Sequence, residues 1–462
     1  MRALPKFQPE ASNQLSTLLE DRFSTNTSIC EQHGKDEGYI APVPPEAVVF
    51  PESTEEVQEI ARICHQHRIP MIPFGVGTSL EGQIIPMHGG ISIDCSRMNR
   101  ILEVNAQDLD ARLEPGVTRR KLNDHVRDQG LFFPVDPGAD ATLGGMASTR
   151  ASGTNAVLYG TMRDNVLALT VVLADGKLLH TGTRARKSAA GYDLTALFVG
   201  SEGTLGIITE LSVRLYGRAE AISSAVCAFD SLKGAVDTVI ETIQMGIPIA
   251  RIELLDEVLM GAVNSYSKLD YALKPTLFLE FHGTPASVRE QAETVGELCN
   301  EHGGSDFQWA AQEEDRRVLW RARHDVAYAC KLLRPHSRLW ATDVCVPISR
   351  LTECILQARQ DIDEAGLIAP IVGHVGDGNF HVTMMLDTSD DAEMARAHTF
   401  NERLVDRALK MGGTSTGEHG IGITKRQMLA DEHGDGVSVM HTLKQALDPL
   451  NLMNPGKLFL AS

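Results

Sequence analysis

The string HVGDGNFH, residues 374–381, has a histidine at each end. Its centre, Asp377-Gly378, favours a two-residue type I′ hairpin turn, because both central positions of that turn take a positive φ. Such a hairpin places His374 directly opposite His381, with β-carbons about 5 Å apart on one face. Two imidazoles in that position could supply half of a metal site. Two ordinary polar residues beside a turn are the alternative, and this string alone leaves it open.

A further histidine follows an acidic residue in the string GEHGIG, residues 417–422. The glycines on either side of Glu418 and His419 let the backbone approach a ligand closely. Glu418 could therefore be the third ligand of the same metal. His419 would then lie beside the metal as a base.

The composition limits the kind of protein and its partners. The chain has 462 residues, 43% hydrophobic and 23% charged, which is ordinary for a globular protein and long enough for two domains. Its 43 Lys and Arg residues against 61 Asp and Glu give a net charge of −18, which argues against a nucleic-acid partner. An anionic substrate would need a local cationic site. The 8 cysteines form no C-x-x-C pair, so we expect reduced thiols.

The sequence also suggests a location. No uninterrupted apolar run approaches the roughly 20 residues that span a bilayer, so we expect no transmembrane segment. The first thirty residues contain Glu10, Glu20 and Asp21 and no apolar core, which argues against a signal peptide and against an acid-poor transit peptide. We therefore expect a cytoplasmic protein, most simply a bacterial one, that is at most peripheral to the inner membrane.

The sequence pattern of the chain changes near its middle. Residues 54–67 have the spacing of a helix with Thr54 as its N-cap, and a short apolar strand follows. From there to about residue 217, β-branched runs alternate with glycine-rich turns. Beyond this point longer helical patterns alternate with isolated strands such as 275–283. The pattern predicts an α+β protein with a domain boundary near 217–221.

Three segments concentrate glycine and small hydroxyl residues where the chain leaves a strand: 73–82, 136–160 and 199–209. Glycines bring backbone N–H groups close to a ligand, and hydroxyls add donors, so such loops suit a pyrophosphate. Any one of them could simply be a tight turn. Neither a G-x-G-x-x-G fingerprint nor a G-x-x-x-x-G-K-[ST] loop fits them. Together the three segments favour a dinucleotide bound outside the Rossmann fold.

These motifs resemble a known family. The strings that match it, in order, are PFGVGTSLEG, the DPGA…TLGG…SGTNAVLYGTMRDNV…LADG segment, VGSEGTLGIITE, HVGDGNFH, GEHGIG and the terminal NPGK. They look like the FAD-dependent D-2-hydroxy acid dehydrogenases of the vanillyl-alcohol-oxidase type. That group includes cytochrome-linked D-lactate dehydrogenases, D-2-hydroxyglutarate dehydrogenases and the flavin subunit of glycolate oxidase. The resemblance extends over nearly the whole chain.

The resemblance implies two domains. Residues 1–217 would form an FAD-binding domain of two α+β subdomains, with 440–462 returning to the flavin. Residues 218–439 would form an α+β substrate and metal-binding domain of the FAD-linked oxidase type.

The resemblance also assigns the residues that would bind FAD. Those of the first loop are Pro73, Gly75, Val76, Gly77, Thr78, Ser79 and Gly82. Those of the second are Pro137, Gly138, Thr142, Gly145, Ser148, Ser152, Gly153 and Tyr159. The third loop and the C-terminus supply Glu202, Gly203, Ile207, Ile208 and Asn454. Some relatives attach the flavin through a histidine of the first loop. This chain has none there, so we expect FAD without a covalent bond.

The segment 314–333 has helical spacing and two arginines of interest. Its apolar stripe consists of Leu319, Ala322, Val326, Cys330 and Leu333. Arg323 falls on the edge of this stripe, whereas Arg321 falls on the opposite, solvated face. A partly buried guanidinium needs an anion, either an internal carboxylate or a substrate. The residues leave both open, and the resemblance assigns Arg323 to the substrate carboxylate.

The resemblance further implies the chemistry. A 2-hydroxy acid would lose a hydride from its α-carbon to the flavin and a proton from its hydroxyl. A divalent metal held by His374, His381 and Glu418 would bind the hydroxyl and one carboxylate oxygen, and His419 would accept the proton. Zn²⁺ and Mn²⁺ both suit this ligand set. Electrons would pass on to a quinone, a cytochrome or an electron-transfer flavoprotein.

One departure from the family concerns the substrate. Relatives that act on dicarboxylates have a lysine two positions before the aspartate of WATDVCVP, where this chain has Ala341. We therefore expect a small monocarboxylate, D-lactate oxidised to pyruvate, with D-2-hydroxyglutarate dehydrogenase or glycolate oxidase subunit as alternatives. A metal-dependent hydrolase with the same ligands, and a non-redox flavin transferase like the alkyl-dihydroxyacetone-phosphate synthases, are the rivals from other classes.

Overall fold

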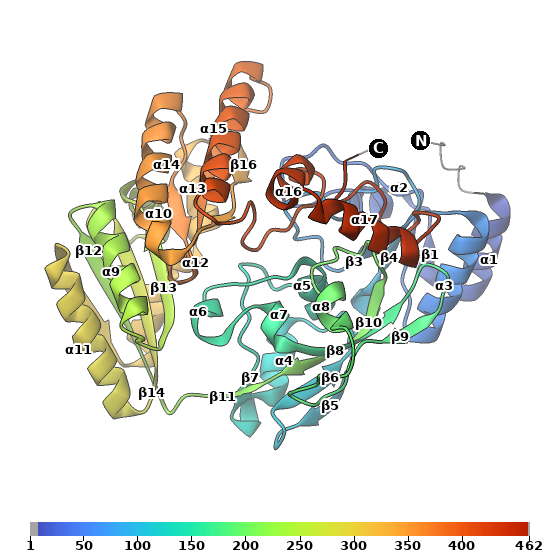
Figure 1. Ribbon diagram of the computed structural model, residues 1–462, viewed down its shortest axis with the longest axis horizontal. Helices are drawn as coiled ribbons and strands as arrows, with labels where there is room; N and C mark the ends of the chain where they lie inside the picture. Colours follow the sequence, from blue (N-terminus) through green and yellow to red (C-terminus); the bar gives the residue numbers. More distant parts are fainter. Residues whose placement is uncertain (1–7, 461–462) are drawn as a thin grey trace. The chain divides into compact units, whose positions relative to one another are not determined.

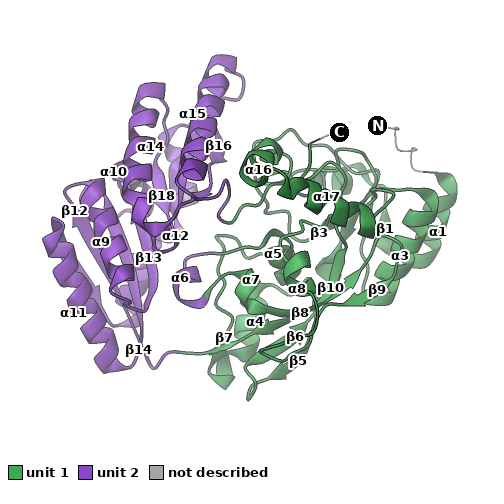
Figure 2. Cartoon of the chain, viewed as in Figure 1, with its two compact units in different colours: residues 1–152, 160–218, 418–462 green, residues 153–159, 219–417 purple. Residues whose placement is uncertain are grey.

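The structure, a computed structural model, describes residues 8–460 and divides into two compact units (Figures 1 and 2). Unit 1 contains residues 1–152, 160–218 and 418–462, and unit 2 contains residues 153–159 and 219–417. The C-terminal segment of unit 1 begins at Glu418 and is therefore longer than the expected 440–462. The short segment 153–159, from the middle of the second glycine-rich loop, belongs to unit 2.

The first sheet of unit 1 has the strand order β1-β2-β4-β3. Its strands are β1 (Phe23–Ser24), β2 (Ala47–Val49), β3 (Met71–Phe74) and β4 (Ile91–Asp94), and its helices are α1 (Pro9–Leu19), α2 (Thr27–Gln32) and α3 (Thr54–His67). The predicted helix over 54–67 is confirmed, but its N-cap is Ser53 and not Thr54. The Ser53 side chain accepts the N–H of Glu56, and Thr54 is already the first helical residue.

The second sheet of unit 1 is antiparallel, with the order β5-β6-β10-β8-β9. Its strands are β5 (Ile101–Asn105), β6 (Asp110–Leu113), β8 (Val166–Val172), β9 (Leu178–His180) and β10 (Ile207–Arg214), beside a pair of β7 (Leu131–Phe132) and β11 (Tyr216–Gly217). Its helices are α4 (Arg119–Val126), α5 (Leu143–Thr149), α7 (Met162–Asn165) and α8 (Leu194–Phe198). The β-branched runs predicted as strands all lie here or in the first sheet.

The C-terminal segment is held in unit 1 by backbone and side-chain bonds. It contains α16 (Arg426–His433) and α17 (Gly436–Leu447), coloured red in Figure 1. After α17, Leu452 O accepts the N–H of Met71 at 2.7 Å, and Asn454 N donates to Met71 O at 2.8 Å. Lys444 Nζ, which is buried, donates to the carbonyl of Thr204 at 2.8 Å. The end of the chain thus lies beside β3 and the first glycine-rich loop.

Unit 2 is built on an antiparallel sheet of order β15-β12-β14-β13-β18-β19-β16, with β17 paired to β19. Its strands are β12 (Ala221–Phe229), β13 (Ile249–Leu255), β14 (Thr276–Gly283), β15 (Gly304–Ala310), β16 (Arg338–Ala341), β17 (Val344–Cys345), β18 (Ile371–Gly373) and β19 (Asn379–Leu386). Its helices are α6 (Ala156–Tyr159), α9 (Leu232–Gln244), α10 (Glu257–Ser267), α11 (Pro285–Glu301), α12 (Glu313–His324), α13 (Val326–Leu333), α14 (Leu351–Ala365) and α15 (Asp391–Lys410).

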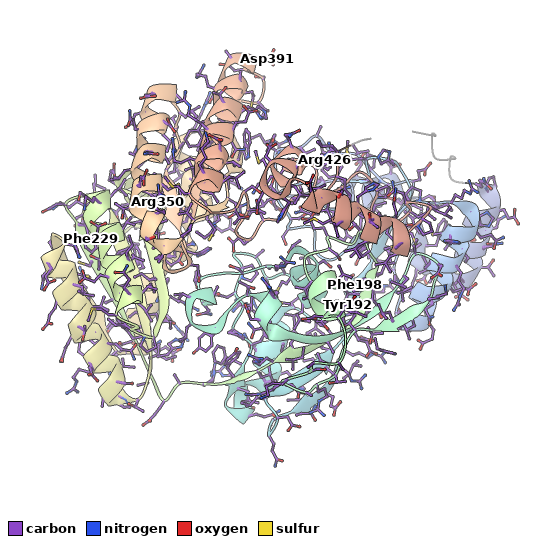
Figure 3. The ribbon with its side chains drawn as sticks, viewed as in Figure 1. Tyr192, Phe198, Phe229, Arg350, Asp391 and Arg426 are labelled. Carbon is purple, nitrogen blue, oxygen red and sulfur yellow. The ribbon has the colours of Figure 1, made fainter. Side chains whose placement is uncertain are left out.

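Helices cover both faces of this sheet. An apolar core joins α10, α12 and α13 to one face, through residues such as Leu255, Phe278 and Val372. Helices α9, α11, α14 and α15 cover the other face, which includes Trp340 against His398 of α15. Figure 3 labels one buried aromatic residue of each unit, Phe198 and Phe229.

Strand registers show which polar residues share the α12 face. Paired residues of neighbouring antiparallel strands point to the same face, and residues two apart on one strand do so too. Leu255 pairs with Val372, and Val372 pairs with His381. Glu253, two residues before Leu255, therefore lies on the same face as His381. None of the helices between residues 8 and 460 has both the length and the apolarity needed to cross a bilayer.

Candidate active site

The three glycine-rich loops lie together in unit 1. A Cβ on Gly75 would be only 2.5 Å from Thr142 Oγ1, so the first and second loops are in contact. A Cβ on Gly203 would lie 3.0 Å from the ring of Pro73, so the third loop packs on the first. The close approach at Gly75 requires a residue without a side chain.

The first loop has unused hydrogen-bond donors. The backbone N–H groups of 76–79 donate no hydrogen bond to any residue that the structure describes. Ser79 Oγ and Asn454 Oδ1 are both buried and have no partner among residues 8–460. Consecutive N–H groups and a hydroxyl are suitable donors for a pyrophosphate. These residues therefore fit the phosphate portion of FAD.

Several predicted cofactor residues serve the fold as well. Asn454 donates through Nδ2 to Gln83 O at 2.8 Å and to Glu202 O at 2.7 Å, which ties the C-terminus to two loops. The Glu202 carboxylate accepts the N–H groups of Ile421 and Gly422 at 2.6 and 2.8 Å. Burial raises the pKa of Glu202 to about 7.

Four other predicted cofactor residues fall into two groups: two lie in apolar cores, and two belong to unit 2. Ile207 and Ile208 begin β10, with their side chains in the two apolar cores. Gly153 and Tyr159 lie in the segment that belongs to unit 2.

The two histidines of 374–381 come together, but not through the predicted hairpin. His381 pairs with Val372 and not with His374. Residues 375–377 form a short 3₁₀ turn, and of Asp377 and Gly378 only the glycine has a positive φ, 79°, so a type I′ turn is excluded. A Cβ on Gly378 would lie 2.1 Å from Val346 O, which explains the glycine. The prediction of directly opposed histidines is therefore wrong.

The imidazoles are nevertheless close. The ring centroids of His374 and His381 are 5.5 Å apart with planes at 85°, and ligand nitrogens of the two rings lie within 4.8 Å of each other. His374 Nδ1 lies 2.7 Å from Glu253 Oε1, and His381 Nδ1 lies 3.0 Å from Thr342 O. Both partners are acceptors, so both Nδ1 atoms bear the hydrogen and both Nε2 atoms bear the lone pair. This tautomer, fixed by an outer partner, is the form in which histidine binds a metal.

The segment 314–333 is divided at Asp325 into α12 and α13, but Arg323 is placed as the apolar stripe predicted. Leu319, Ala322 and Val326 are buried, and the side chain of Arg323 is only 16% exposed, whereas Arg321 is exposed. Arg323 Nε donates to Glu253 Oε2 at 2.7 Å, so an internal carboxylate is its anion. Its Nη1 and Nη2 groups make no hydrogen bond within residues 8–460. The Nη1 and Nη2 groups of Arg323 are therefore available to bind a second anion.

Sequence reasoning missed Glu253 and Asp343. Burial raises the pKa of Glu253, but its interactions with His374 and Arg323 outweigh this and hold its pKa below the usual range. Asp343 Oδ1 accepts Asn379 Nδ2 at 2.8 Å, and Oδ2 accepts the Thr416 hydroxyl at 2.7 Å. No local pattern identifies either residue, because their partners lie between 36 and 121 positions away along the chain.

His419 has a carboxylate neighbour within unit 1. Glu81 Oε1 lies 3.6 Å from His419 Nδ1 and 3.2 Å from Lys425 Nζ, and Glu81 also bonds the Thr424 hydroxyl. Burial raises the pKa of Glu81, but Lys425 and His419 outweigh it and lower the pKa overall. The His419 carbonyl accepts Gln83 Nε2 at 2.7 Å. Glu81 belongs to the first glycine-rich loop, and its position there was the only available signal.

A second polar network lies on the α12 face of unit 2. Tyr159 Oη is 2.7 Å from His282 Nδ1, and His282 Nε2 is 2.9 Å from Glu280 Oε1. Arg251 Nε donates to Asn155 Oδ1 at 2.8 Å. The segment 153–159 is thus bonded to β13 and β14 of unit 2.

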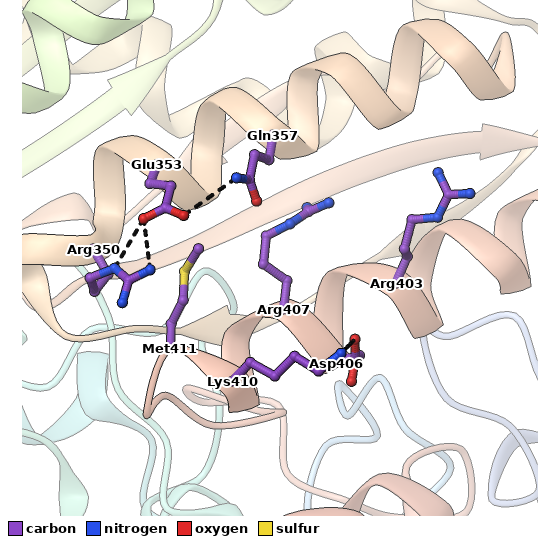
Figure 4. Close-up of a pocket in the computed structure, with 8 residues that line it drawn as sticks. All are labelled: Arg350, Glu353, Gln357, Arg403, Asp406, Arg407, Lys410 and Met411. Carbon is purple, nitrogen blue, oxygen red and sulfur yellow. Dashed lines mark hydrogen bonds and ion pairs between the residues drawn. The ribbon is translucent and has the colours of Figure 1, made fainter.

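A surface groove of unit 2 lies apart from these residues. It has a volume of about 320 Å³ between α14 and α15, and its lining includes Arg350, Arg403, Arg407 and Lys410 (Figure 4). Each of these cations is paired with a carboxylate. No predicted site residue lines the groove.

Comparison with known proteins identifies the family of the chain. The family described as FAD linked oxidases, C-terminal domain, matches residues 218–458, and the FAD binding domain matches residues 45–182. The "Probable D-lactate dehydrogenase, mitochondrial" of Danio rerio is 54% identical over 446 residues, 96% of this chain and 90% of the relative. The chain belongs to the FAD-dependent D-2-hydroxy acid dehydrogenases.

Other members of the family are similar over comparable lengths. "D-lactate dehydrogenase [cytochrome], mitochondrial" of Arabidopsis thaliana is 44% identical, covering 97% of this chain and 80% of the relative. "Glycolate oxidase subunit GlcD" of Bacillus subtilis is 36% identical, covering 90% and 89%. These findings confirm the predicted family, FAD as the cofactor and the oxidoreductase class.

Solved structures confirm the fold. A p-cresol methylhydroxylase has a TM-score of 0.79 at 18% identity, covering 97% of this chain and 96% of that chain. An alkyldihydroxyacetonephosphate synthase has a TM-score of 0.77 at 21% identity, covering 98% and 86%. At such identities the likeness shows the fold alone. The predicted α+β architecture of vanillyl-alcohol-oxidase type is confirmed.

The expected cytoplasmic location is wrong. Four relatives at 38–54% identity are named as mitochondrial, which contradicts that expectation. The expectation used acidic residues near the start of the sequence. Those residues do not separate the two compartments.

Proposed function

We propose that the enzyme oxidises D-lactate to pyruvate with FAD as hydride acceptor and with a divalent metal, Zn²⁺ or Mn²⁺, at His374, His381 and Glu418. The main support is the matched pair of histidines, whose Nδ1 atoms both meet fixed acceptors. Relatives at 38–54% identity are named D-lactate dehydrogenases, in agreement with the substrate expected from the sequence. Membership in an FAD-dependent family rules against the metal-dependent hydrolase.

Substrate binding would fall to Arg323. Its Nε is held by Glu253, so the remaining N–H groups form a preoriented fork for the lactate carboxylate. The metal, when bound, supplies Lewis acidity that makes the lactate hydroxyl easier to deprotonate. FAD, when bound, supplies the acceptor for the hydride that leaves C2.

Glu418 is proposed as the third metal ligand through its place in the chain. It follows Gly417 directly, and a Cβ on Gly417 would lie 2.3 Å from Asn379 Nδ2. Thr416 is bonded to Asp343 on the same side. The backbone just before Glu418 is therefore fixed against β19, two residues from His381.

His419 is proposed as the base. A carboxylate near Nδ1 favours the tautomer in which Nε2 bears the lone pair, as a base requires. Nε2 would take the hydroxyl proton while the hydride leaves C2. The products of the step balance as pyruvate, a protonated imidazole and a reduced flavin.

The structure supports a preference for a monocarboxylate. Ala341 pairs with Thr383, and so lies on the same sheet face as His381. The two arginines that precede Ala341 in the chain do not replace the missing lysine. Arg334 bonds Met385 O and pairs with Glu393, and Arg338 lies on the opposite face with Trp340. A second substrate carboxylate would find no cation of this strand on the face that carries Ala341.

An anaerobic titration of the purified yellow protein tests the proposal. D-lactate should bleach the flavin absorption at lower concentration than D-2-hydroxyglutarate or glycolate. Bleaching by glycolate first would favour the glycolate oxidase alternative. A flavin that none of the three bleaches would favour a non-redox transferase and contradict the proposal.

A further inference from the structure

Glu253 occupies an unusual position between two groups of the proposed site. It is fully buried on β13, in the middle of the sheet. Oε1 lies 2.7 Å from His374 Nδ1, and Oε2 accepts Arg323 Nε at 2.7 Å. One carboxylate thus contacts both a proposed metal ligand and the proposed substrate arginine.

We propose that Glu253 is a positioning residue that fixes His374 and Arg323 relative to each other, so that metal affinity and substrate affinity depend on the same side chain. The inference rests on the proposed function, because it takes His374 as a ligand and Arg323 as the substrate-binding residue. Glu253 itself touches neither metal nor substrate.

The chemistry of the two contacts requires a carboxylate. His374 Nδ1 and Arg323 Nε are both donors, and a carboxylate offers one oxygen to each. A glutamine has a single acceptor oxygen, so it can serve only one of them and must direct its amide N–H groups at the other. A charged guanidinium is the stronger donor, so Arg323 should take the glutamine oxygen.

The two donors come from separate elements, and the Glu253 carboxylate accepts a hydrogen bond from both. His374 follows β18, and Gly373 of that strand pairs with Leu254 of β13, next to Glu253. Arg323 comes from α12, which packs on the same face of the sheet. The Glu253 carboxylate on this central strand therefore fixes the separation between His374 Nδ1 and Arg323 Nε.

The first measurement is Zn²⁺ affinity in the absence of substrate, by competition with a chromophoric chelator against the FAD-loaded protein. Loss of an outer partner of a metal-bound histidine costs about 10–100-fold in affinity, and Glu253→Gln should lose that much. Arg323→Gln should leave Zn²⁺ affinity within about threefold, because Glu253 still accepts from His374. The Arg323→Gln substitution should nevertheless raise the KM for D-lactate.

The decisive variant is the double substitution Glu253→Gln with Arg323→Gln. Without the competing guanidinium, the glutamine oxygen is available to His374 Nδ1. Zn²⁺ affinity should then recover by at least about fivefold over Glu253→Gln alone, the value of one hydrogen bond. A role limited to general stability predicts no such recovery.

Glu280→Gln is the matched control. Glu280 is also buried, on the adjacent strand and the same face, and it is ion-paired, but with Arg251 and His282. The Zn²⁺ affinity of the Glu280→Gln variant should equal that of the wild type. On the arginine side, Arg321→Gln is the control, because Arg321 is exposed on the same helix.

The outcomes separate this inference from the proposed function. Wild-type affinity for Zn²⁺ in Glu253→Gln, or a double variant no better than that single variant, would overturn the inference while the metal site stands. A wild type that binds neither Zn²⁺ nor Mn²⁺ would overturn the inference together with the metal site of the proposed function. If Glu253→Gln does not fold, the double variant, which removes both charges of the pair, is compared with Arg323→Gln, and a difference of more than about fivefold would overturn the inference.

Discussion

In unit 1 the proposed cofactor contacts are mostly backbone: the N–H groups of 76–79 and the close approach of the loops at Gly75 and Gly203. In unit 2 the proposed contacts are side chains, each fixed by a named partner on a central sheet. Backbone donors do not depend on side-chain identity, so unit 1 can keep its ligand while its sequence changes. Side-chain chemistry depends on single residues, so we expect unit 2 to determine the substrate.

The histidines of the two units differ in the same way. His374 and His381 have Nδ1 contacts of 2.7 and 3.0 Å, as expected of ligands that must not move. The corresponding contact of His419 with Glu81 is 3.6 Å, and Lys425 shares the same oxygen. A looser contact suits a group that changes its protonation during turnover.

The largest effect should come from removing a ligand of unit 2. His374→Ala or His381→Ala should abolish tight metal binding and reduce activity by about 10⁴-fold or more, because a metal contributes several kcal/mol to the transition state. FAD content should stay at the wild-type level, since most of the proposed flavin contacts lie in the other unit. Metal analysis and the flavin spectrum of one sample measure both quantities.

His336→Asn is the control for these variants, because His336 is exposed in unit 2 and its φ of 67° suits asparagine. Full metal content with full activity in His374→Ala would remove that residue from the site. Loss of FAD together with the metal would contradict the division of labour between the two units.

The next effect concerns His419, the proposed base, which belongs to unit 1. His419→Gln should slow flavin reduction at saturating D-lactate by about 10²–10⁴-fold, the usual loss for a general base, while metal content is kept. Stopped-flow absorbance measures the rate. His433→Gln, exposed in the same unit, should reduce the flavin at the wild-type rate. An unchanged rate in His419→Gln would leave that residue with a structural role only.

The sequence predicted elements well where the signal is local. The helix 54–67 and the strands within the glycine-rich half follow from spacing and propensity, and the buried stripe of α12 placed Arg323 correctly. The hairpin at Asp377-Gly378 failed because a 3₁₀ turn occupies residues 375–377 and shifts the register of β19. A dipeptide preference of this kind is weak beside the packing of Gly376 and Gly378 against their neighbours.

Partners distant in sequence could not be predicted. Nothing near Arg323 indicates that its anion is Glu253, 70 positions earlier. The assignment of 153–159 to unit 2 likewise depends on bonds from Asn155 to Arg251 and from Tyr159 to His282. Such contacts are set by strand order, and one sequence does not reveal it.

A smaller effect should appear in the choice of substrate, which the comparison assigns to unit 2. A second carboxylate in a desolvated pocket without a cation costs about 2–5 kcal/mol, so D-lactate should exceed D-2-hydroxyglutarate in kcat/KM by about 10²-fold or more. Ala341→Lys should narrow this ratio, and Ala341→Met, similar in length but uncharged, should not. Equal kcat/KM values for the two acids in the wild type would contradict the role given to Ala341.

The smallest effect tests the backbone contacts of unit 1 through a buried hydroxyl of the same loop, that of Ser79. Ser79 Oγ is buried without a partner among the described residues, so in the absence of FAD its replacement costs no hydrogen bond. Ser79→Ala should therefore leave the midpoint temperature of thermal unfolding of the FAD-free protein unchanged or slightly raised. With FAD present it should lose one hydrogen bond, about fivefold in the dissociation constant measured by flavin fluorescence. Ser92→Ala is the matched control, because Ser92 Oγ on β4 is equally buried and equally without a partner, but lies outside the glycine-rich loops. FAD affinity should be unchanged in this control. Equal FAD affinity in both variants and the wild type would show that the loop binds the cofactor through its backbone alone. That result would sharpen the contrast between the units, whereas a loss far above tenfold would contradict it.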